Sequence, residues 1–210
     1  MGWRKGLVSV GGVNVSYFYN ECVYEPSDDT EVAAEAIVRL ASAGLPSKTS
    51  LRSVLELGSG SGVLAALAAE VLRPSIVAAV DVSPHAAEAS RLTLGDGALV
   101  VQCYAGRCLR GPWDLVILNP PYLPTPLDEL NDSRCGGWMS WGWSEEAGHA
   151  ELCESAASLG NYVLMVRSSL EELDVDRCLA LRGLRKVSTL AERRTFMETI
   201  WAELWTKASG

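Results

Sequence analysis

The chain is organised around residues 115–122, which read Leu-Val-Ile-Leu-Asn-Pro-Pro-Tyr. The four apolar residues predict a buried strand of a parallel sheet. Pro120 and Pro121 then exclude both further strand and helix. Because open α/β sheets bind ligands at the carboxyl ends of their strands, this Asn-Pro-Pro-Tyr corner is a candidate site. There Asn119 offers an amide, Pro120 a carbonyl and Tyr122 an aromatic face.

A glycine loop precedes this corner in the chain and follows another predicted strand. Its pattern is Glu56-x-Gly58-x-Gly60-x-Gly62, and a helix rich in Ala and Leu comes next. Glycine lets the backbone approach a ligand closely, because no Cβ lies in the way. The loop therefore predicts a second part of a ligand site.

Strands alternate with helices through residues 52–183, which indicates an α/β fold with a mostly parallel sheet and helices on both faces. A hairpin around Gly11-Gly12 and a helix ending near Gly44 come before this region. The last two strands have no helix between them, so one must run antiparallel. The expected strands are residues 52–57, 76–80, 98–104, 113–118, 161–166, 184–190 and 196–205, and the expected helices are residues 62–73, 84–94, 144–159 and 169–181.

Residues 123–143 form a long loop that contains Trp138, Trp141 and Trp143. Loops of this length in a compact domain are commonly functional. We expect this one either to pack as a lid or to form a platform for a substrate.

Composition narrows the function. The chain has 210 residues, 48% of them hydrophobic, and a net charge of −8. This charge disfavours a protein that binds nucleic acid through phosphate neutralisation alone, so we expect no stable nucleic-acid binding. No apolar run is long enough to span a membrane and the start lacks a signal-peptide core, so a cytoplasmic protein is expected.

The cysteines and histidines do not predict a metal site. The six cysteines form no Cys-x-x-Cys pair, and the histidines are His85 and His149. We expect the cysteines to be small buried apolar residues, with disulfide bonds as the alternative.

The spacing Gly58-x-Gly60-x-Gly62 differs from the Gly-x-Gly-x-x-Gly of dinucleotide-binding proteins. With Glu56 before it, the loop resembles the first motif of class I S-adenosylmethionine-dependent methyltransferases. The resemblance implies S-adenosylmethionine as the cofactor and a seven-stranded, Rossmann-like sheet in the order 3-2-1-4-5-7-6. Asp81, which follows the next strand, is placed to accept hydrogen bonds from both ribose hydroxyls.

The Asn-Pro-Pro-Tyr corner suits methyl transfer to a planar nitrogen. The lone pair of an amide or an exocyclic amine is delocalised, so such a nitrogen is a poor nucleophile. Acceptors must hold its N–H groups and turn the lone pair toward the methyl carbon. The side-chain oxygen of Asn119 and the carbonyl of Pro120 can hold these groups, and Tyr122 can pack on the planar group. The gain in rate is positional and electrostatic and requires no general base.

A more particular resemblance is to the short archaeal and eukaryotic form of HemK-type protein methyltransferases. Residues 23–30 read Val-Tyr-Glu-Pro-Ser-Asp-Asp-Thr and resemble the family hallmark Val-Tyr-Glu-Pro-x-x-Asp-Thr. Residues 55–62, 119–122 and 194–199 match in order and spacing. The implied substrate is the glutamine side-chain amide in the Gly-Gly-Gln loop of a class I translation release factor. The implied organisation is a single methyltransferase domain, residues 1–210, with the hairpin and lid helix in 1–50 and the catalytic core in 51–206.

Motifs and resemblance together assign the expected site residues. Thr30 would lie at the cofactor lid, Glu56 and Gly58 at the methionine end, and Asp81 at the ribose. The family commonly has an acidic residue where this chain has Arg107, so we expect adenine to be recognised by backbone groups or more weakly. The expected catalytic residues are Asn119, Pro120, Pro121 and Tyr122, and the expected cofactor-binding residues are Thr30, Glu56, Gly58, Ser59, Gly60, Gly62, Asp81, Val82, Gly106, Arg107 and Asn119.

The strand over residues 98–104 would be an outer edge of the sheet. It carries no charge and many apolar residues, so it invites pairing with another strand. The short HemK family is similar to enzymes that dock a small zinc-binding activator protein there, and we expect such a heterodimer. The alternative is that the chain's own N-terminal hairpin covers this edge.

Two other functions stay open at this point. An RNA or DNA adenine-N6 or guanine-N2 methyltransferase shares the Asn-Pro-Pro-Tyr chemistry, but the acidic charge and the lack of an appended nucleic-acid domain disfavour it. The other is a non-catalytic scaffold protein that keeps the fold of a cofactor-binding enzyme. The presence of Asn119 and Asp81 argues against it.

Overall fold

The computed structural model of the chain describes residues 2–43, 51–122, 135 and 146–207. Its helices are α1 (Asp28–Ala43), α2 (Val63–Leu72), α3 (Pro84–Leu94), the short 3-10 helix η1 (Gly95–Gly97), α5 (Glu146–Leu159) and α6 (Val175–Leu181). Its strands are β1 (Arg4–Val10), β2 (Val13–Tyr19), β3 (Ser53–Leu57), β4 (Ile76–Asp81), β5 (Leu99–Gln102), β6 (Trp113–Leu118), β7 (Gly160–Ser168), β8 (Leu184–Arg194) and β9 (Thr199–Lys207).

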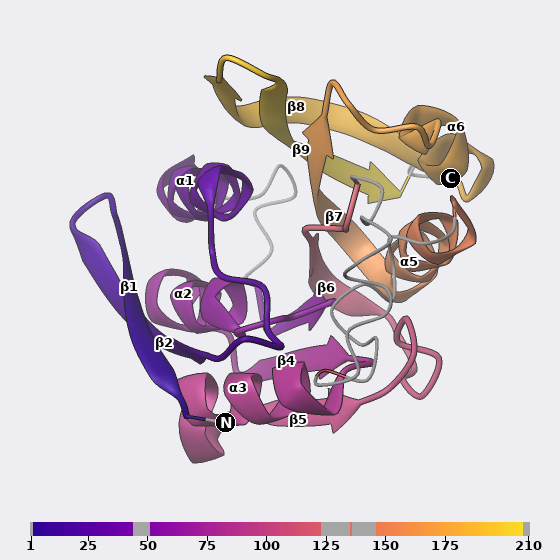
Figure 1. Cartoon of the computed structure of the whole chain (residues 1–210). Helices are drawn as coiled ribbons and strands as arrows, with labels where there is room; N and C mark the ends of the chain where they lie inside the picture. Colours follow the sequence, from indigo (N-terminus) through magenta and orange to yellow (C-terminus); the bar gives the residue numbers. More distant parts are fainter. Residues whose placement is uncertain (1, 44–50, 123–134, 136–145, 208–210) are drawn as a thin grey trace.

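A seven-stranded sheet forms the centre of the molecule, in the order β5-β4-β3-β6-β7-β9-β8 (Figure 1). β9 runs antiparallel to both of its neighbours, and the other pairs are parallel. Counted from β3, this is the order 3-2-1-4-5-7-6. The predicted strand order and the predicted antiparallel strand near the end of the chain are therefore confirmed.

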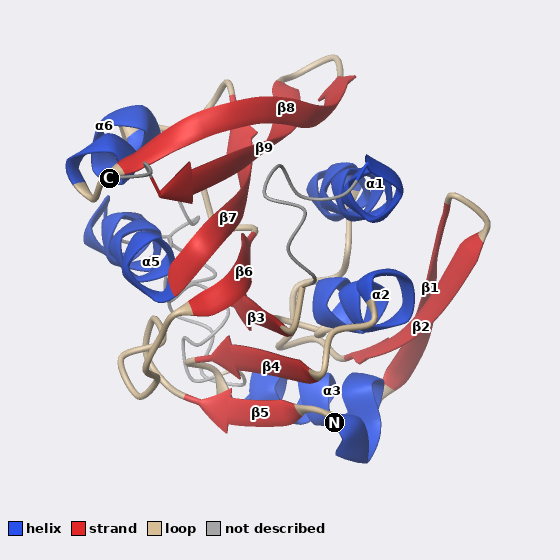
Figure 2. Ribbon diagram, turned by 180° about the vertical axis from the view of Figure 1, so that it is seen from behind, coloured by secondary structure: helices blue, strands red, loops and turns tan. Residues whose placement is uncertain are grey.

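Helices cover both faces of this sheet, with α1, α2 and α3 on one side and α5 and α6 on the other (Figure 2). Alternate residues of the central strands divide between two cores. Val54 packs in the core under α1 and α2, and the next residue, Leu55, packs in the core under α5 and α6. This division explains why the strands are apolar at nearly every position.

The hairpin of β1 and β2 forms a sheet of its own and packs against α2 and α3. Within the described residues, β5 pairs with β4 alone, so its outer edge carries no strand of this chain. The alternative in which the hairpin covers this edge is wrong.

Two helix starts follow from local chemistry. Gly62 has φ 74°, and a Cβ at this position would lie 2.9 Å from Ser90 Oγ of α3. Only glycine therefore lets α2 begin so close to α3. Ser83 caps α3, since its Oγ accepts a hydrogen bond from Ala86 N at 3.3 Å and Pro84 occupies the first turn.

Three predicted boundaries are wrong. β5 ends at Gln102, because residues 103–108 form a turn closed by the Cys103–Cys108 disulfide. The helix expected from residue 169 begins only at Val175, because Asp174 caps it there with a 3.0 Å bond from Arg177 N. The strand expected over residues 184–190 continues to Arg194, because the solvent side of an edge strand tolerates charged residues, and the turn to β9 therefore lies at 195–198.

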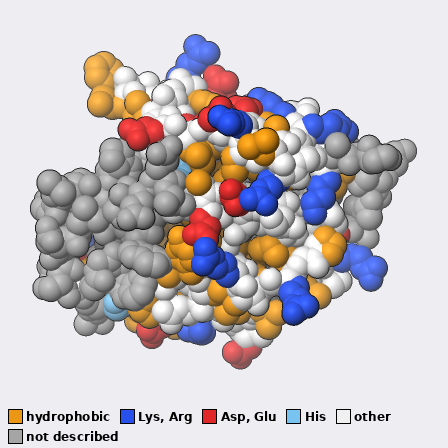
Figure 3. Space-filling view, turned by 90° about the vertical axis from the view of Figure 1, so that its right-hand side faces the viewer, with side chains coloured by type: hydrophobic (Ala, Val, Ile, Leu, Met, Phe, Trp, Pro, Cys, Tyr) orange, Lys and Arg blue, Asp and Glu red, His pale blue; other side chains and the backbone are white. Residues whose placement is uncertain are grey.

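The predicted tryptophan loop lies outside the described residues, apart from Cys135. Of the helices that the structure describes, none combines the length and apolar character needed to cross a bilayer. Basic and acidic side chains are interspersed over the face drawn in Figure 3.

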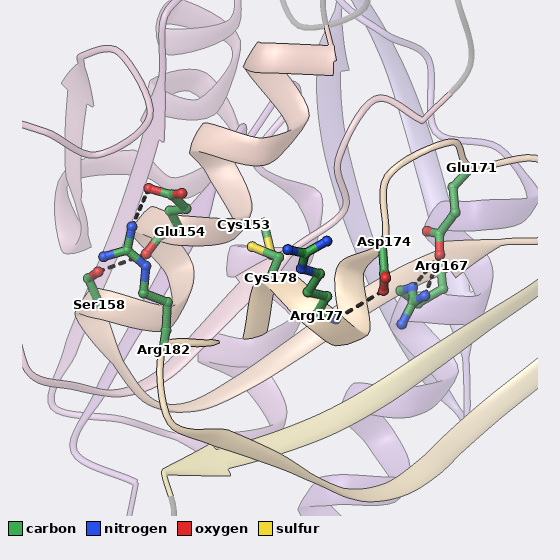
Figure 4. Close-up of a disulfide and its surroundings, with 9 residues drawn as sticks. All are labelled: Cys153, Glu154, Ser158, Arg167, Glu171, Asp174, Arg177, Cys178 and Arg182. Carbon is green, nitrogen blue, oxygen red and sulfur yellow. Dashed lines mark hydrogen bonds and ion pairs between the residues drawn. A yellow bond between two sulfur atoms is a disulfide. The ribbon is translucent and has the colours of Figure 1, made fainter. Parts of the chain in front are cut away.

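A buried ion cluster around Arg167 ties β7, β9 and α6 together, and Figure 4 shows its Arg167–Glu171 pair. Arg167 is 6% exposed, lies 3.2 Å from Glu203 and 3.3 Å from Asp176, and also pairs with Glu171. Buried charges of this kind are stable only when paired and hydrogen-bonded. No member of the cluster lines the cavity described below, so we assign it to the fold.

Candidate active site

The register of the sheet brings the two sequence motifs to one edge. Leu57 ends β3 and pairs with the penultimate residue of β4 and the last residue of β6. The residues that follow, Gly58, Asp81 and Asn119, therefore lie on three neighbouring strands about 5 Å apart. This is the carboxyl edge, where the sequence predicts the site.

A cavity of about 220 Å³ lies at this edge. It is lined by most of the predicted site residues: Thr30, Glu56, Gly58, Ser59, Gly60, Asp81, Val82, Asn119, Pro120, Pro121 and Tyr122. Gly58 and Gly60 have φ 66° and 52°, and no heavy atom lies within 4 Å of a Cβ built at either position. The glycine loop thus leaves space in which a ligand can approach the backbone.

Three predicted cofactor residues do not line the cavity. Gly62 is needed for the packing of α2 on α3. A Cβ at Gly106 would lie 2.8 Å from Leu57 Cδ2, so it too meets a packing requirement. Arg107 pairs with Glu151, and its guanidinium lies 5.1 Å from the centre of the Tyr104 ring. Tyr104, rather than Arg107, lines the cavity.

Asn119 is held in one orientation by a carboxylate from the start of α1. Its Nδ2 donates to Asp29 Oδ2 at 2.8 Å. Because a carboxylate only accepts hydrogen bonds, the amide must turn its NH₂ toward Asp29 and its oxygen away. That oxygen, Oδ1, is buried and has no hydrogen-bond partner among the described residues. A buried acceptor without a partner is costly in isolation, so it is suited to bind a donor group of a substrate.

Asp29 was not among the residues predicted from sequence, although it belongs to the Asp-Asp-Thr signal at residues 28–30. Its Oδ1 accepts from Tyr24 Oη at 3.1 Å and Thr30 N at 2.7 Å, and its Oδ2 accepts from Asn119. Asp29 is 6% exposed and lines the cavity. The sequence signal was its place as the Asp of the hallmark Val-Tyr-Glu-Pro-x-x-Asp-Thr, which does not reveal a contact with a residue far along the chain.

Asp81 lies beside the glycine loop. Its Oδ2 accepts from Gly60 N and its Oδ1 from Ser83 N, both at 2.9 Å. Burial raises the pKa of this carboxyl, and the N–H groups of Gly60, Ser83 and Val82 oppose the rise. Both oxygens keep lone pairs for further donors, as binding of two ribose hydroxyls would require.

Glu56 lies beneath the loop, 3% exposed, and accepts from Ala65 N at 2.8 Å. Burial raises its pKa to about 8, with the Ala65 bond lowering it and the charge of Asp81 raising it. A buried carboxyl of this kind stays protonated near neutral pH unless a cation binds beside it.

Replacing Glu56 by glutamine should therefore stabilise the protein without ligand at pH 8. The folded protein keeps a proton on Glu56 until about pH 8, whereas the unfolded chain releases it near the ordinary value of 4.5. Stability from this group is fully present below pH about 4.5 and is lost as pH rises to about 8. Thermal and denaturant unfolding from pH 4 to 9 should give Glu56→Gln an advantage of about 2–4 kcal/mol at pH 8 that disappears at pH 4. An advantage independent of pH would contradict the assignment.

An aromatic and acidic wall closes the corner. Burial raises the pKa of Tyr122, and the charges of Asp29, Glu198 and Asp28 raise it further. Burial also raises the pKa of Tyr24, and the charge of Asp29 raises it further. These carboxylates make the electrostatic potential at the corner negative, which favours neutral or basic substrates over phosphate-bearing ones.

All six cysteines are paired, so the expectation of free buried cysteines is wrong and the alternative of disulfides is confirmed. The pairs are Cys22–Cys135, Cys103–Cys108 and Cys153–Cys178, and Figure 4 shows the last of them. Partners as far as 113 residues apart meet only in the folded chain, so spacing in the sequence does not reveal them. Cys22 and Cys103 line the cavity.

Removing the Cys22–Cys135 bond with a Cys22→Ser/Cys135→Ser variant should lower the free energy of unfolding by about 2–4 kcal/mol. The bond closes a long loop and so restricts the unfolded chain. A Cys153→Ser/Cys178→Ser variant is the matched control, with a separation of 25 residues, and should lose about 1 kcal/mol less. Denaturant titration under non-reducing conditions measures both, and equal losses would show that strain or packing dominates.

Strand order, glycine loop and the acid after the second core strand define a class I methyltransferase fold. Solved structures agree: an rRNA N2 G1207 methyltransferase of T. thermophilus with AdoMet and guanosine has a TM-score of 0.69 at 14% identity, covering 98% of this chain and 51% of that one. The E. cuniculi Mtq2-Trm112 complex is described as responsible for methylation of the eRF1 translation termination factor. It has a TM-score of 0.63 at 22% sequence identity, and the match covers 89% of this chain and 99% of that one. At these identities the likeness shows the fold.

Sequence comparison finds more particular similarities to methyltransferases over part of the chain. The family described as "Methyltransferase small domain" matches residues 36–126. The release factor glutamine methyltransferase of Chlorobaculum tepidum is 35% identical over 119 residues, 51% of this chain and 40% of that protein. Methyltransferase HEMK2 of Mus musculus is 31% identical over 116 residues, which are 51% of this chain and 52% of that protein. Over about half of its own length this chain is similar to these methyltransferases, and it spans about half of their length.

Proposed function

We propose that this chain transfers a methyl group from S-adenosylmethionine to the side-chain amide nitrogen of glutamine in the Gly-Gly-Gln motif of a class I translation release factor. The observation that carries the proposal is the Oδ1 of Asn119, which is buried beside the glycine loop and has no partner among the residues that the structure describes. Homologues named release factor glutamine methyltransferase support the same substrate.

The residues of the cavity fit the cofactor. The glycine loop leaves space where side chains would otherwise lie, Asp81 has lone pairs for ribose hydroxyls, and Glu56 is a buried carboxyl that a cationic ammonium would ionise. The chemistry that S-adenosylmethionine supplies is an electrophilic methyl group. The chain holds the acceptor nitrogen: Asn119 Oδ1 and the Pro120 carbonyl accept its N–H groups, and Tyr122 packs on its plane.

A protein amide suits the corner better than a nucleobase. The Asn-Pro-Pro-Tyr acceptors would hold an exocyclic amine equally well, and a nucleobase amine is therefore the alternative substrate. The carboxylates that raise the pKa of Tyr122 repel phosphates, and the net charge of −8 acts in the same direction.

One assay separates these functions. Labelled S-adenosylmethionine is supplied with the chain and one of three acceptors: a release factor, its Gln→Ala loop variant, or RNA. We expect label in the release factor alone. Label in RNA but not in the release factor would overturn the proposal, and no transfer to any acceptor, even with an activator present, would favour a non-catalytic role.

The partner proposed here is a small zinc-binding activator protein that adds a strand to β5. This strand is an open edge among the described residues, and Leu99 on it is 59% exposed. The Mtq2-Trm112 complex, which matches this chain in fold and contains a second protein, supports such an assembly. Co-expression should raise solubility, cofactor affinity and activity, and Leu99→Lys should reduce the gain. If all three are unchanged by co-expression, there is no such partner.

A further inference from the structure

The turn between β8 and β9 presents two large apolar side chains to solvent. Phe196 is fully exposed and Met197 is 74% exposed. Figure 3 shows apolar side chains protruding at the upper edge of the molecule, at the height of this turn in Figure 1. Such turns usually carry Gly, Asn, Asp or Ser, so the apolar pair is not explained by the turn itself.

The turn is tightly held, so these side chains are presented by an ordered backbone. Thr195 N donates to Glu198 O at 2.8 Å, which closes the turn. The Thr195 hydroxyl accepts from Glu198 N at 3.1 Å and from Met197 N at 3.3 Å. A preformed apolar tip loses little conformational freedom on binding, which favours recognition.

The turn is also linked to the catalytic corner through α1. Arg193, just before it, binds Asp28 at 2.9 Å and Glu35 at 3.0 Å on α1, beside Asp29. Glu198, just after it, accepts a hydrogen bond from Ser168 at the end of β7. Its charge also raises the pKa of Tyr122 and of Tyr24. The tip is therefore tied to α1, the helix that carries Asp29, while residues 193–198 themselves do not line the cavity.

We propose that Phe196 and Met197 form a docking tip that inserts into an apolar pocket of the protein substrate, next to the loop that carries the methylated glutamine. This inference rests on the proposed function and adds the surface that selects a folded protein. The binding partner of the tip is a protein for two reasons. An apolar tip matches an apolar pocket of a protein surface, and the carboxylates near it repel a phosphate backbone.

The test uses a Phe196→Ser/Met197→Ser variant, the full chain and a folded release factor. We expect kcat/KM for the release factor to fall at least about tenfold, carried by KM, as for the loss of an aromatic anchor at an interface. The cofactor Kd and the unfolding temperature should stay unchanged. Leu181→Ser is the matched control, since Leu181 is also 74% exposed but lies at the end of α6. It should behave as the wild type.

The outcomes separate the two proposals. If the wild-type chain transfers label to the release factor and the double variant keeps its kcat/KM, the docking tip is overturned and the proposed function stands. An equal loss of kcat/KM in Leu181→Ser would also overturn the docking proposal, because the effect would then not be specific to the Phe196–Met197 tip. If the wild-type chain labels RNA and not the release factor, the proposed function fails, and the protein occupant named here fails with it.

Discussion

Asn119→Ala is expected to reduce the rate of methyl transfer by at least about 100-fold and to leave cofactor affinity within about twofold of wild type. Removing one preorganised hydrogen-bonding group from a buried reaction centre typically costs about 10²–10³ in rate. Here the lost group is Oδ1, which is buried and has no hydrogen-bond partner in the described part of the chain, and Asn119 lines the cavity. Because its role is to hold the acceptor nitrogen, the loss should fall on kcat.

Single-turnover transfer of labelled methyl to the release factor measures the rate, and calorimetry measures cofactor binding. The unfolding temperature shows whether the variant is folded. Calorimetry that finds cofactor binding lost would contradict this role for Asn119 and place the residue in the cofactor site instead.

Asp29→Asn should lower kcat by about 10–100-fold through its effect on Asn119. The carboxylate accepts from Asn119, Tyr24 and Thr30. An amide at this position has one acceptor oxygen and an NH₂ that must face one of these donors, so Asn119 is no longer held in one orientation. Asp28→Asn is the matched control, because Asp28 is the neighbouring carboxylate but binds Arg193.

A double-mutant cycle decides whether Asp29 acts through Asn119. Residues that act as one unit are strongly non-additive, so Asp29→Asn in the Asn119→Ala background should change kcat by less than about threefold. Additive losses would show that Asp29 contributes by an independent route.

Much of the site follows from local sequence. The apolar run before Asn119, the glycines after Glu56 and the acid at 81 each mark the end of a parallel strand. Because such ends share one edge of the sheet, their proximity is predictable from strand order. The same reasoning also selected Gly62 and Gly106, which do not line the cavity and instead allow close packing. A glycine can serve backbone conformation and close packing as well as a ligand, and the sequence pattern does not distinguish these uses.

Segments governed by their own periodicity and turn chemistry were thus determined by the sequence alone: the hairpin, the start of α3 at Pro84 and the two motifs of the site. The strand order was implied by the family resemblance of these motifs. The contact between Asp29 and Asn119, 90 residues apart, was decided by the tertiary structure, as were the disulfides and the link of the Phe196–Met197 tip to α1. These contacts join segments whose local patterns carry no information about each other. Only the packing of α1 against the sheet and the docking of the β8–β9 hairpin on α1 bring them together.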